Sequence, residues 1–503
     1  MNERAPPKNI LILGGGTAGW MAANLFAHAW GGRGSKITLL ESAAIGIIGV
    51  GEGSTPKMRR FFDRIGVSEA EWMPACNASY KCGIRFPDWS TRKGFKSYYH
   101  PFFSLSDDES IRAFHHNLTL RQRNLDVHAH PDAFFISNHL AENRRAPIPT
   151  PGMDYDSEYA YHFDAGLIGK FLKDKAINAG VEHIIDTVTA VNQGESGDIA
   201  SVETEAHGAQ AADFFIDCTG FASILICKTL GVNFKSYTDI LFNDRAVAMP
   251  TPLDGDTLPS ETVSTALKYG WVWKIPLTNR FGNGYVYSSS YIDEAQAEQE
   301  LRQHLGLEDD PVEARHLKMR VGRLEHPWEK NCLAVGLSQG FIEPLEATAL
   351  MIVQDTLENF IDSYENGGYS DLNRPQFNRK VNAIFDAVKD YIFMHYKLNS
   401  REDTDYWVDN RENENVSDSI AEILRVWDKG GDLLQELRRQ AGNLAYSPTS
   451  WFCILTGMGR LPRKPKKPSK KFRVHDPKDM RRLCTDMIEN FPDHRAALDS
   501  LAD

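Results

Sequence analysis

The chain has 503 residues, of which 42% are hydrophobic and 25% are charged, an ordinary mixture for a globular protein with room for two or three domain-sized units. Acidic residues outnumber basic ones by 68 to 56, and the formal net charge of -12 argues against a globally basic nucleic-acid binder. No 18 apolar residues follow one another, so the sequence predicts no membrane-spanning helix.

The cysteines and histidines show no pattern of a cross-linked or metal-binding protein. The seven cysteines are odd in number and lack Cys-x-x-Cys spacing, which argues against a disulfide framework and a structural zinc site. The pairs His115-His116 and His128-x-His130 have no carboxylate or cysteine at ligand spacing. Three glycines interrupt the apolar stretch that starts at Ile10, so a signal peptide is not predicted. We therefore expect a reduced, cytoplasmic protein without a metal site.

The first 41 residues have the pattern of a strand, a glycine-rich turn, a helix and a second strand. The apolar run Ile10 to Leu13 predicts the first strand, and the small residues from Thr17 to about Trp30 predict the helix. Residues 37–40 predict the second strand, which runs into Glu41. This βαβ unit predicts an α/β fold with a Rossmann-like nucleotide-binding domain.

The glycines of the turn follow the pattern Gly-x-Gly-x-x-Gly. Gly14 allows the tight turn, Gly16 lets the backbone approach a pyrophosphate, and Gly19 permits close packing of the helix on the strand. Free N–H groups at the helix N-terminus would bind the phosphates, and the Glu41 carboxylate would accept a hydrogen bond from a ribose hydroxyl. The residues predicted to bind the dinucleotide are Gly14, Gly16, Thr17, Ala18, Gly19 and Glu41.

Two further glycine-containing segments favour FAD over NAD. Residues 49–53 come soon after the second strand, and residues 336–340 form a similar turn far downstream. Their exposed backbone N–H groups suit a long cofactor with scattered contacts, although ordinary loop glycines would give the same pattern. The further residues predicted to bind FAD are Gly49, Val50, Gly51, Glu52, Val188, Leu337 and Leu350.

The rest of the chain divides into a strand-rich part and a mostly helical part. The predicted strands are residues 181–191, 199–205, 214–217 and 332–335. Apolar residues three and four apart predict a helix over about 346–364, and the pattern from about 376 to 457 is mostly helical. We expect residues 1–375 to form a cofactor-binding module with a mixed sheet, and residues 376–503 to form a mostly helical module that covers the substrate.

The segment from Arg460 to Arg473 is rich in lysine and proline. Because prolines prevent a regular helix, the segment is predicted to be an exposed connector to a short terminal helix. Binding of a nucleic acid or an anionic surface is the alternative interpretation.

Four motifs follow one another along the chain: Gly14 to Trp20, Lys81 to Phe86 with Trp89, Trp271 to Pro276, and Pro344 to Thr348. They resemble the motifs of flavin-dependent halogenases of the tryptophan-halogenase type. The Trp-x-Trp-x-Ile-Pro hexapeptide is the most specific, because in that family it separates halogenases from the hydroxylating flavin monooxygenases of the same fold. The resemblance spans nearly the whole chain.

The resemblance implies a halogenating enzyme with a flavoprotein-monooxygenase-type domain. Its cofactor would be FAD, supplied as FADH2 by a separate flavin reductase, and it would use O2 and a chloride or bromide ion. The hypohalous acid formed from them would reach a lysine beside a small aromatic substrate. We expect neither a nucleic acid nor a membrane as partner, and a homodimer stays open because dimers are common in such families.

Lys81 and Glu346 match the family's two catalytic residues. Residues 81–86 alternate as on a strand with two different faces, and in isolation Lys81 would be interpreted as a solvated surface lysine. In the family role its ammonium would polarise the bond between oxygen and halogen, or its buried neutral amine would form a haloamine; both remain open.

Glu346 would stabilise the cationic arene intermediate and accept its proton. Pro344 and the apolar periodicity predict that Glu346 lies at a helix N-terminus, where in isolation it would only complement the helix dipole. The same helix start offers N–H groups at Thr348 and Ala349, which match the family's halide site.

The chain departs from the tryptophan-specific members at two points. Those members usually have Ser after the glutamate and Gly two places later, where this chain has Ala347 and Ala349. Alanine at 349 matters only if that position needs a positive φ. The paired tyrosines that hold the amino-acid head group are not found, and residues 443–446 stand in that region. We expect a smaller indole or another electron-rich arene as substrate rather than free tryptophan.

Alternation puts Trp271 and Trp273 on one face of a strand, where they could be ordinary core residues. The resemblance makes Trp271, Trp273, Ile275 and Pro276 a wall that keeps the organic substrate away from the flavin. Two other functions stay open: an aromatic flavin monooxygenase that hydroxylates at the flavin, and a flavin-binding interaction protein whose Lys/Pro-rich segment contacts a partner.

Overall fold

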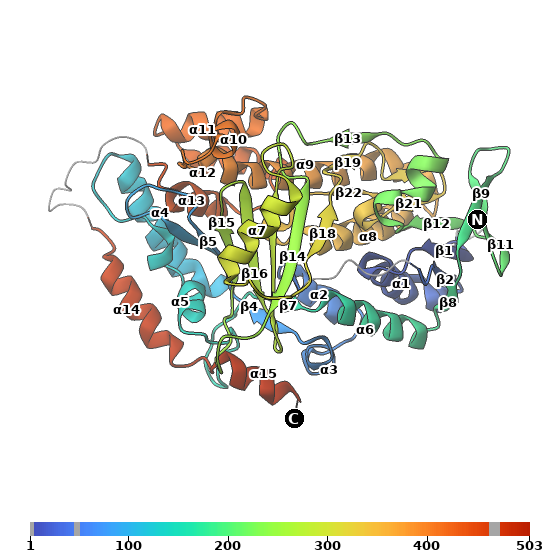
Figure 1. The fold of residues 1–503 in the computed structure, drawn as a ribbon, viewed down its shortest axis with the longest axis horizontal. Coiled ribbons are helices and arrows are strands. Elements are labelled where there is room, and N and C mark those ends of the chain that lie inside the picture. The colour runs from blue at the N-terminus through green and yellow to red at the C-terminus, as the bar shows by residue number, and fades with distance from the viewer. Residues whose placement is uncertain (1–4, 45–50, 462–472, 503) are drawn as a thin grey trace.

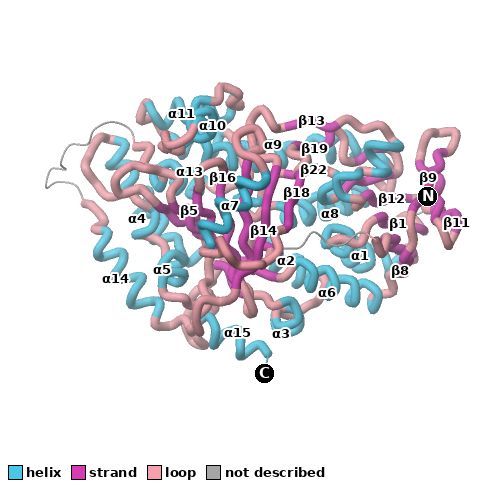
Figure 2. The backbone as a smooth tube through the Cα atoms, in the orientation of Figure 1, coloured by secondary structure: helices cyan, strands magenta, loops and turns pink. Residues whose placement is uncertain are grey.

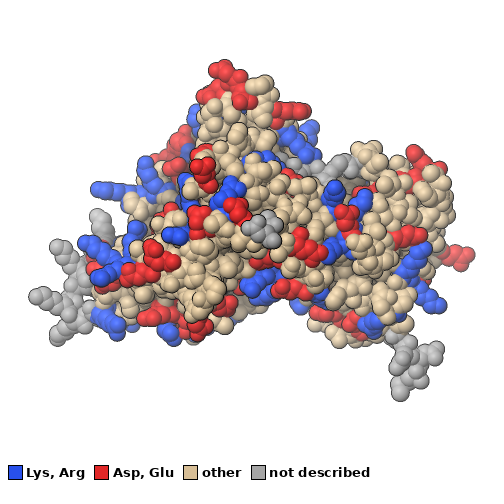
Figure 3. All heavy atoms as spheres, turned by 90° about the horizontal axis from the view of Figure 1, so that it is seen from below, with Lys and Arg blue, Asp and Glu red and all other residues tan. Residues whose placement is uncertain are grey.

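The computed structural model describes residues 5–44, 51–461 and 473–502. Figure 1 shows a parallel sheet at one end of the molecule, a larger sheet in its middle, and helices along its top and at its other end. Acidic and basic side chains are mixed over the face seen in Figure 3. None of the described helices is both long enough and apolar enough to cross a membrane.

The first sheet has six strands, of which all but one edge strand are parallel. In order across the sheet they are β20 (Trp328–Glu329), β21 (Cys332–Ala334), β12 (Phe214–Asp217), β1 (Asn9–Leu13), β2 (Lys36–Glu41) and β8 (Glu182–Ile185). β1 lies between β12 and β2, with Ile12 opposite Ile216 on one side and Leu39 on the other. This arrangement confirms the predicted α/β fold with a Rossmann-like domain.

Aromatic side chains fix the first helix on this sheet. The helices that pack there are α1 (Thr17–Trp30), α6 (Ala165–Asn178) and α8 (Ala349–Asn366), and α1 contacts both of the others. Phe26 of α1 is fully buried, and its ring packs edge-on against Phe360 of α8 with 6.1 Å between the centroids. Burial of each such side chain contributes about 1.5–3 kcal/mol. The glycine turn before α1 is therefore held by a rigid element.

The single strand predicted over residues 181–191 is wrong. β8 ends at Ile185, and the chain continues into a separate sheet of β9 (Val188–Gln193), β10 (Ile199–Thr204) and β11 (Gly208–Ala211). Asp186 causes the break, because its carboxylate accepts hydrogen bonds from the backbone N–H groups of Thr187 at 2.8 Å and His207 at 2.9 Å. The other predicted strands are confirmed as β10, β12 and β21.

The central sheet has seven strands and two different faces. Across the sheet they are β18 (Arg315–Lys318), β14 (Arg245–Thr251), β17 (Phe281–Tyr287), β16 (Gly270–Pro276), β15 (Thr262–Ala266), β5 (Gly83–Pro87) and β6 (Ser97–Pro101). Val272 of β16 packs in one cluster with Leu301 of α7 (Glu294–Leu305), which covers the outer face in Figure 1. Because side chains alternate along a strand, Trp271 and Trp273 face the inner side.

A small sheet carries Lys81. It consists of β3 (Glu52–Gly53), β7 (Ala160–Phe163) and β4 (Ser79–Lys81). A separate small sheet consists of β13 (Phe234–Ser236), β19 (Gly322–Leu324) and β22 (Gly340–Phe341). The prediction of one continuous strand over residues 81–86 is wrong, because the chain changes sheets at Cys82. The Cys82 N–H donates to the Ser260 carbonyl at 2.7 Å, which anchors this corner.

The C-terminal part is mostly helical, as predicted (Figure 2). Its helices are α9 (Arg374–Leu398), α10 (Asp405–Glu412), α11 (Asp418–Asp428), α12 (Leu433–Arg439) and α13 (Pro448–Gly457). The chain ends in two helices, α14 (Pro477–Ile488) and α15 (His494–Ala502), rather than the one predicted. Earlier helices are α2 (Lys57–Arg64), α3 (Glu69–Trp72), α4 (Asp108–Gln122) and α5 (Ile136–Glu142). Most of the predicted connector lies outside the described residues, and the module boundary near residue 375 stays a prediction.

Candidate active site

The turn between β1 and α1 leaves room for a ligand at one glycine only. Gly14 has φ 113°, and a Cβ there would lie 2.2 Å from the Cys218 carbonyl oxygen. A Cβ on Gly19 would lie 2.0 Å from the carbonyl oxygen of Gly14, whereas a Cβ on Gly16 would meet no atom within 4 Å. α1 begins at Thr17, and the first N–H groups of a helix have no partner within it. The turn therefore suits the pyrophosphate of a dinucleotide.

Glu41 lies at the end of β2, beside this turn. Its carboxylate accepts a hydrogen bond from His183 Nε2 at 2.8 Å and lies 3.6 Å from Lys173 Nζ. A Cβ on Gly15 would meet the Glu41 carboxylate, so Glu41 fills the space that this glycine leaves. Val188 packs against the apolar cluster under the end of β2. The roles of Glu41 and Val188 toward a cofactor stay predictions.

The turn Gly336–Ser338 lies against the start of α1. A Cβ on Gly336 would lie 2.7 Å from Cβ of Ala18 and 3.9 Å from the side chain of Val353 in α8. The structure thus brings together the turn that holds Leu337, the first turn of α1, and the N-terminal half of α8, which also carries Leu350. An extended cofactor would need such a convergence of distant segments.

The second glycine segment is described from residue 51 onward, and the predicted contacts Gly49 and Val50 lie outside the described residues. A Cβ on Gly51 would lie 3.4 Å from the Ile275 side chain, so this segment lies against the strand of the Trp-x-Trp motif. Ile275 itself is buried.

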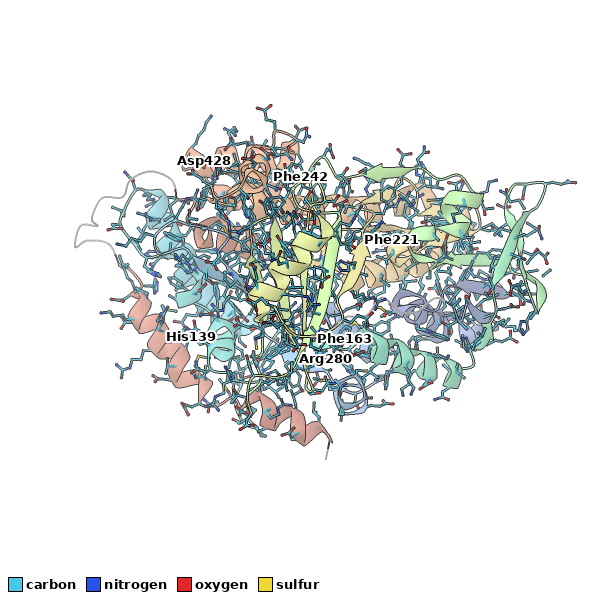
Figure 4. The ribbon with its side chains drawn as sticks, in the orientation of Figure 1. His139, Phe163, Phe221, Phe242, Arg280 and Asp428 are labelled. Atoms are coloured by element: carbon cyan, nitrogen blue, oxygen red, sulfur yellow. The ribbon has the colours of Figure 1, made fainter. Side chains whose placement is uncertain are left out.

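Glu52 pairs with Phe163 of β7, which is labelled in Figure 4. Burial, together with the charge of Asp164, raises the pKa of Glu52 to about 7. Asp164 accepts a hydrogen bond at 2.8 Å from Arg280, which Figure 4 labels beside Phe163. Glu52 is thus a carboxyl group that can change its protonation state near neutral pH.

Lys81 is completely buried at the end of β4. Its Nζ donates a hydrogen bond to the Ser54 carbonyl oxygen at 3.1 Å and lies 5.5 Å from the centre of the Phe102 ring. Burial lowers the pKa of Lys81 from 10.5 to about 7, and the charge of Glu346 opposes this effect. The interpretation of Lys81 as a surface lysine is wrong, and both protonation states of its amine are accessible at neutral pH.

Glu346 is the last residue of a 3-10 turn, Pro344–Glu346, whereas α8 begins only at Ala349. Glu346 thus lies directly before the N-terminus of α8, and the long helix expected from about 346 starts later. Ala347 between the two segments has φ 56°, a left-handed conformation that stops the 3-10 turn from continuing into the helix.

Two histidines from distant segments hold the Glu346 carboxylate. His100 Nδ1, on β6, lies 2.9 and 3.1 Å from its two oxygens, and His395 Nε2, on α9, lies 3.1 Å from Oε1. Burial alone would raise the pKa of Glu346, but the charges and hydrogen bonds of His100 and His395 lower it to about 2. His395 Nε2 also lies 2.8 Å from the Tyr98 hydroxyl. Glu346 is thus a buried anion whose charge acts on Lys81.

The start of α8 provides the predicted halide groups. Thr348 is buried and precedes the helix, and Ala349, its first residue, is exposed. The left-handed conformation lies at Ala347 rather than at Ala349, so alanine causes no strain at position 349. N–H groups at a helix start can bind an anion, and the halide role of these two residues stays a prediction.

The Trp-x-Trp strand is hydrogen-bonded to the segment before Glu346 and to the strand of Lys81. The ring centroids of Trp271 and Trp273 lie 6.2 Å apart, so both do lie on one face. Trp271 Nε1 donates to Glu343 Oε2 at 2.8 Å, three residues before Glu346. The Pro276 carbonyl accepts a hydrogen bond from the Ser79 hydroxyl, on the strand of Lys81, at 2.6 Å.

Residues 9–473 match the sequence model of the family described as tryptophan halogenase. The chain belongs to this family. Among curated relatives, a tryptophan 6-halogenase of Streptomyces toxytricini is 38% identical over 85% of each chain. A 7-chloro-L-tryptophan 6-halogenase of Kutzneria sp. (strain 744) is 37% identical over 90% of each chain. A solved structure of a flavin-dependent halogenase from Brevundimonas sp. BAL3 superposes with TM-score 0.86 at 32% identity, and covers 99% of both chains.

As a tryptophan halogenase family member, the chain is a flavin-dependent enzyme, and its residues fit the cofactor. The direction open at Gly16 is the space that a pyrophosphate would take, and the convergence of the turns at Ala18, Leu337 and Leu350 matches a long dinucleotide. Gly14 and Gly19 would support this site through the backbone rather than by direct contact.

Several residues that contact Lys81, Glu346 or Trp271 were not predicted from the sequence as functional. They are Ser54, Phe102, His100, His395 and Glu343. Glu343 could have been noticed as a second carboxylate directly before the motif that contains Glu346. Burial raises its pKa, and its Oε2 accepts hydrogen bonds from Tyr396 at 2.5 Å and Asn243 at 2.9 Å. His395-Tyr396 is a stretch in which the sequence also resembles the family, but nothing in the sequence indicates that His395 or His100 contacts Glu346.

Proposed function

We propose that the chain chlorinates or brominates a neutral aromatic substrate of the indole type, with Lys81 and Glu346 as its catalytic residues. One observation carries this proposal: the buried amine of Lys81, with a pKa of about 7, interacts electrostatically with the buried carboxylate anion of Glu346. The strand with Trp271 and Trp273 is hydrogen-bonded both to the strand of Lys81 and to the segment that precedes Glu346.

FADH2 from a separate flavin reductase would, when bound, activate O2, and O2 would be the oxidant that turns a chloride or bromide ion into hypohalous acid. The backbone at Gly16 and the first turn of α1 would bind its pyrophosphate. The N–H groups of Thr348 and Ala349 would hold the halide ion at the start of α8. Gly51 lies against the side chain of Ile275 on the tryptophan strand, so the second glycine segment is next to that strand.

Lys81 would direct the halogen to the substrate. As an ammonium, Nζ donates a hydrogen bond to the hypohalous oxygen, and gives up its proton as that oxygen leaves as water while the arene takes the halogen. As a neutral amine, Nζ attacks the halogen itself, releases water, and passes the halogen to the arene from a haloamine. With a pKa of about 7, Lys81 has substantial populations of both forms at neutral pH. Either route converts the arene and hypohalous acid into the halogenated arene and water.

Glu346 would complete the substitution. The arene that has accepted the halogen carries a positive charge and must lose a proton from the substituted carbon. A carboxylate held as an anion by His100 and His395 stabilises that charge and accepts the proton. Its low pKa means that the proton passes on readily, so that the anion is restored for the next turnover.

The side chains near Glu346 suit a neutral ring. Tyr446 stacks on Tyr391 with 3.7 Å between the centroids, and its ring lies 6.0 Å from that of His100. The segment that carries Tyr446, residues 443–446, contains no charged side chain that would pair with an amino-acid head group. We therefore assign an indole without a charged amino-acid head group as the substrate class, although two of the relatives are named for tryptophan or chlorotryptophan.

The test is incubation of the purified protein with FAD, a flavin reductase, NADH, O2 and either chloride or bromide. Indole, substituted indoles, phenols and free tryptophan are the substrates, and mass spectrometry detects the halogen isotope pattern. We expect halogenated indoles that require halide, and less product from tryptophan. Hydroxylated products independent of halide would contradict the proposal. Loss of product in Lys81→Met with retained FAD binding would support the role of the amine.

A further inference from the structure

The strand that carries Lys81 is bonded through both neighbours of this lysine. Cys82 lies next to β5, which runs parallel to β15, and its N–H donates to the Ser260 carbonyl at 2.7 Å. Two residues earlier in each chain segment, Tyr80 and Leu258 would form the next rung of such a ladder. There, however, the two backbones are joined by a side chain.

That side chain is His494, the first residue of α15. The Tyr80 N–H donates to His494 Nε2 at 3.0 Å, and His494 Nδ1 lies 3.1 Å from the Leu258 carbonyl oxygen. Because a carbonyl oxygen only accepts hydrogen bonds, the proton of the ring is on Nδ1. Burial lowers the pKa of His494 to about 4, so the ring is neutral at ordinary pH. Its imidazole thus replaces one missing rung of the sheet, directly beside Lys81.

The residue on the other side of Lys81 also contacts the C-terminal segment. Cys82 is buried in one apolar cluster with Cys484 and Ile488 of α14 and with Phe491. α14 packs along α5, where Figure 4 labels His139. The residue before Lys81 is therefore bonded to His494, and the residue after it belongs to one apolar cluster with residues 484–491.

Backbone hydrogen bonds fix this segment to a loop of the main body. The Ala146 N–H donates to the Pro492 carbonyl at 3.0 Å, and the His494 N–H donates to the Arg144 carbonyl at 2.9 Å. The match to the family model ends at residue 473, before α14 begins. These contacts are thus made by a part of the chain outside the matched region.

We propose that residues 484–494 form part of the framework of the active site, and that His494 is a positioning residue that fixes Lys81 through the Tyr80 backbone. The inference rests on the proposed function, because the position of Lys81 matters for catalysis only if its amine directs the halogen. A displaced amine would let hypohalous acid escape, since a misplacement of about 1 Å can lower a rate on the order of 100-fold.

The experiment compares His494→Ala with His494→Gln and Leu498→Ala. Glutamine has an acceptor and a donor that can take both bonds of the imidazole, whereas alanine has neither. Leu498 is a buried residue of the same helix and serves as the matched control for lost packing.

Two readouts are measured. Hydrogen exchange of the flavin-free protein, read by mass spectrometry, reports the peptide that spans residues 79–86, with the peptide of β1 as reference. The loaded enzyme is assayed for the share of consumed NADH that appears as halogenated indole, in the presence of a soluble scavenger of hypohalous acid.

For His494→Ala we expect roughly fivefold faster exchange in the peptide of residues 79–86 and unchanged exchange in β1. We also expect a 10- to 100-fold lower share of halogenated indole with more halogen in the scavenger. His494→Gln should restore both. The inference would be overturned if His494→Ala had the hydrogen exchange and the share of halogenated indole of the wild type. It would also be overturned if Leu498→Ala changed both readouts as much as His494→Ala does.

If His494→Ala does not fold, His494→Asn replaces it, because that shorter amide cannot reach both partners, and the same comparison with His494→Gln applies. If the wild-type protein makes no halogenated arene, the proposed function fails, while the exchange comparison still decides whether His494 holds β4.

Discussion

Replacement of Lys81 by methionine tests whether the amine is buried as the structure shows. Methionine has nearly the length of lysine without its charge, so Lys81→Met removes the ionisable group and leaves most of the packing. The lost interaction is the hydrogen bond from Nζ to the Ser54 carbonyl at 3.1 Å. Removal of this bond costs about 1 kcal/mol.

The burial of an ionisable amine has the opposite effect on the free energy of unfolding, because it destabilises the wild type and is absent in the variant. The pKa of Lys81 falls from 10.5 to about 7 in the folded protein, which corresponds to at most about 5 kcal/mol at ~1.4 kcal/mol per pKa unit. Between these pH values the unfolded chain binds more protons than the folded chain, so the stability of the wild type rises as the pH rises. Lys81→Met should therefore be about 3 kcal/mol more stable than the wild type at pH 7, and no more stable above about pH 10.5.

The assay is urea denaturation of the flavin-free proteins at constant ionic strength between pH 7 and pH 10.5. The difference in free energy of unfolding between variant and wild type should shrink steadily over this range. Lys36→Met, which removes an exposed lysine of β2, is the control. A difference for Lys81→Met that does not change with pH would refute the burial of the amine.

Four further predictions concern the other parts of the site. Glu346→Gln should lower the turnover of arene by about 10²–10⁴-fold with unchanged FAD affinity, and an unaltered turnover would exclude a role in proton transfer. Gly14→Ala should lower the thermal midpoint, because the new Cβ would lie 2.2 Å from a carbonyl oxygen. Gly16→Ala should keep the midpoint and weaken FAD binding in a fluorescence titration; unchanged affinity would place the pyrophosphate elsewhere. Trp271→Phe should lower the free energy of unfolding by about 1–3 kcal/mol, because a buried carboxylate loses a donor. Unchanged urea denaturation would contradict that reasoning.

The sequence predicts the nucleotide-binding part of the fold well because its signals are local. The helix expected from Thr17 to about Trp30 has these same ends in the structure, and the flanking strands are confirmed. Glycines that a turn requires, and small residues that let a helix approach a sheet, are recorded within a short stretch of sequence. The long helix expected from 346 starts later, because the left-handed conformation of Ala347 has no signal in the residue type.

The surroundings of the two catalytic candidates could not be predicted in the same way. Residues 81–86 alternate as one strand would, and only the tertiary structure shows that the chain changes sheets at Cys82. His395 and Glu346 meet because α9 crosses the site, and His494 reaches Tyr80 across 414 residues of sequence. Such contacts depend on how whole elements pack, which no periodicity of a single element records.

A crystal structure of the protein with FAD and a bound indole would test the central claim most directly. The account predicts that the carbon to be halogenated lies within about 3.5 Å of Lys81 Nζ. It also predicts the Glu346 carboxylate at the same edge of the ring, and the tryptophan strand between the ring and the flavin. An indole stacked on the isoalloxazine, with Lys81 and Glu346 both away from its ring, would contradict the account.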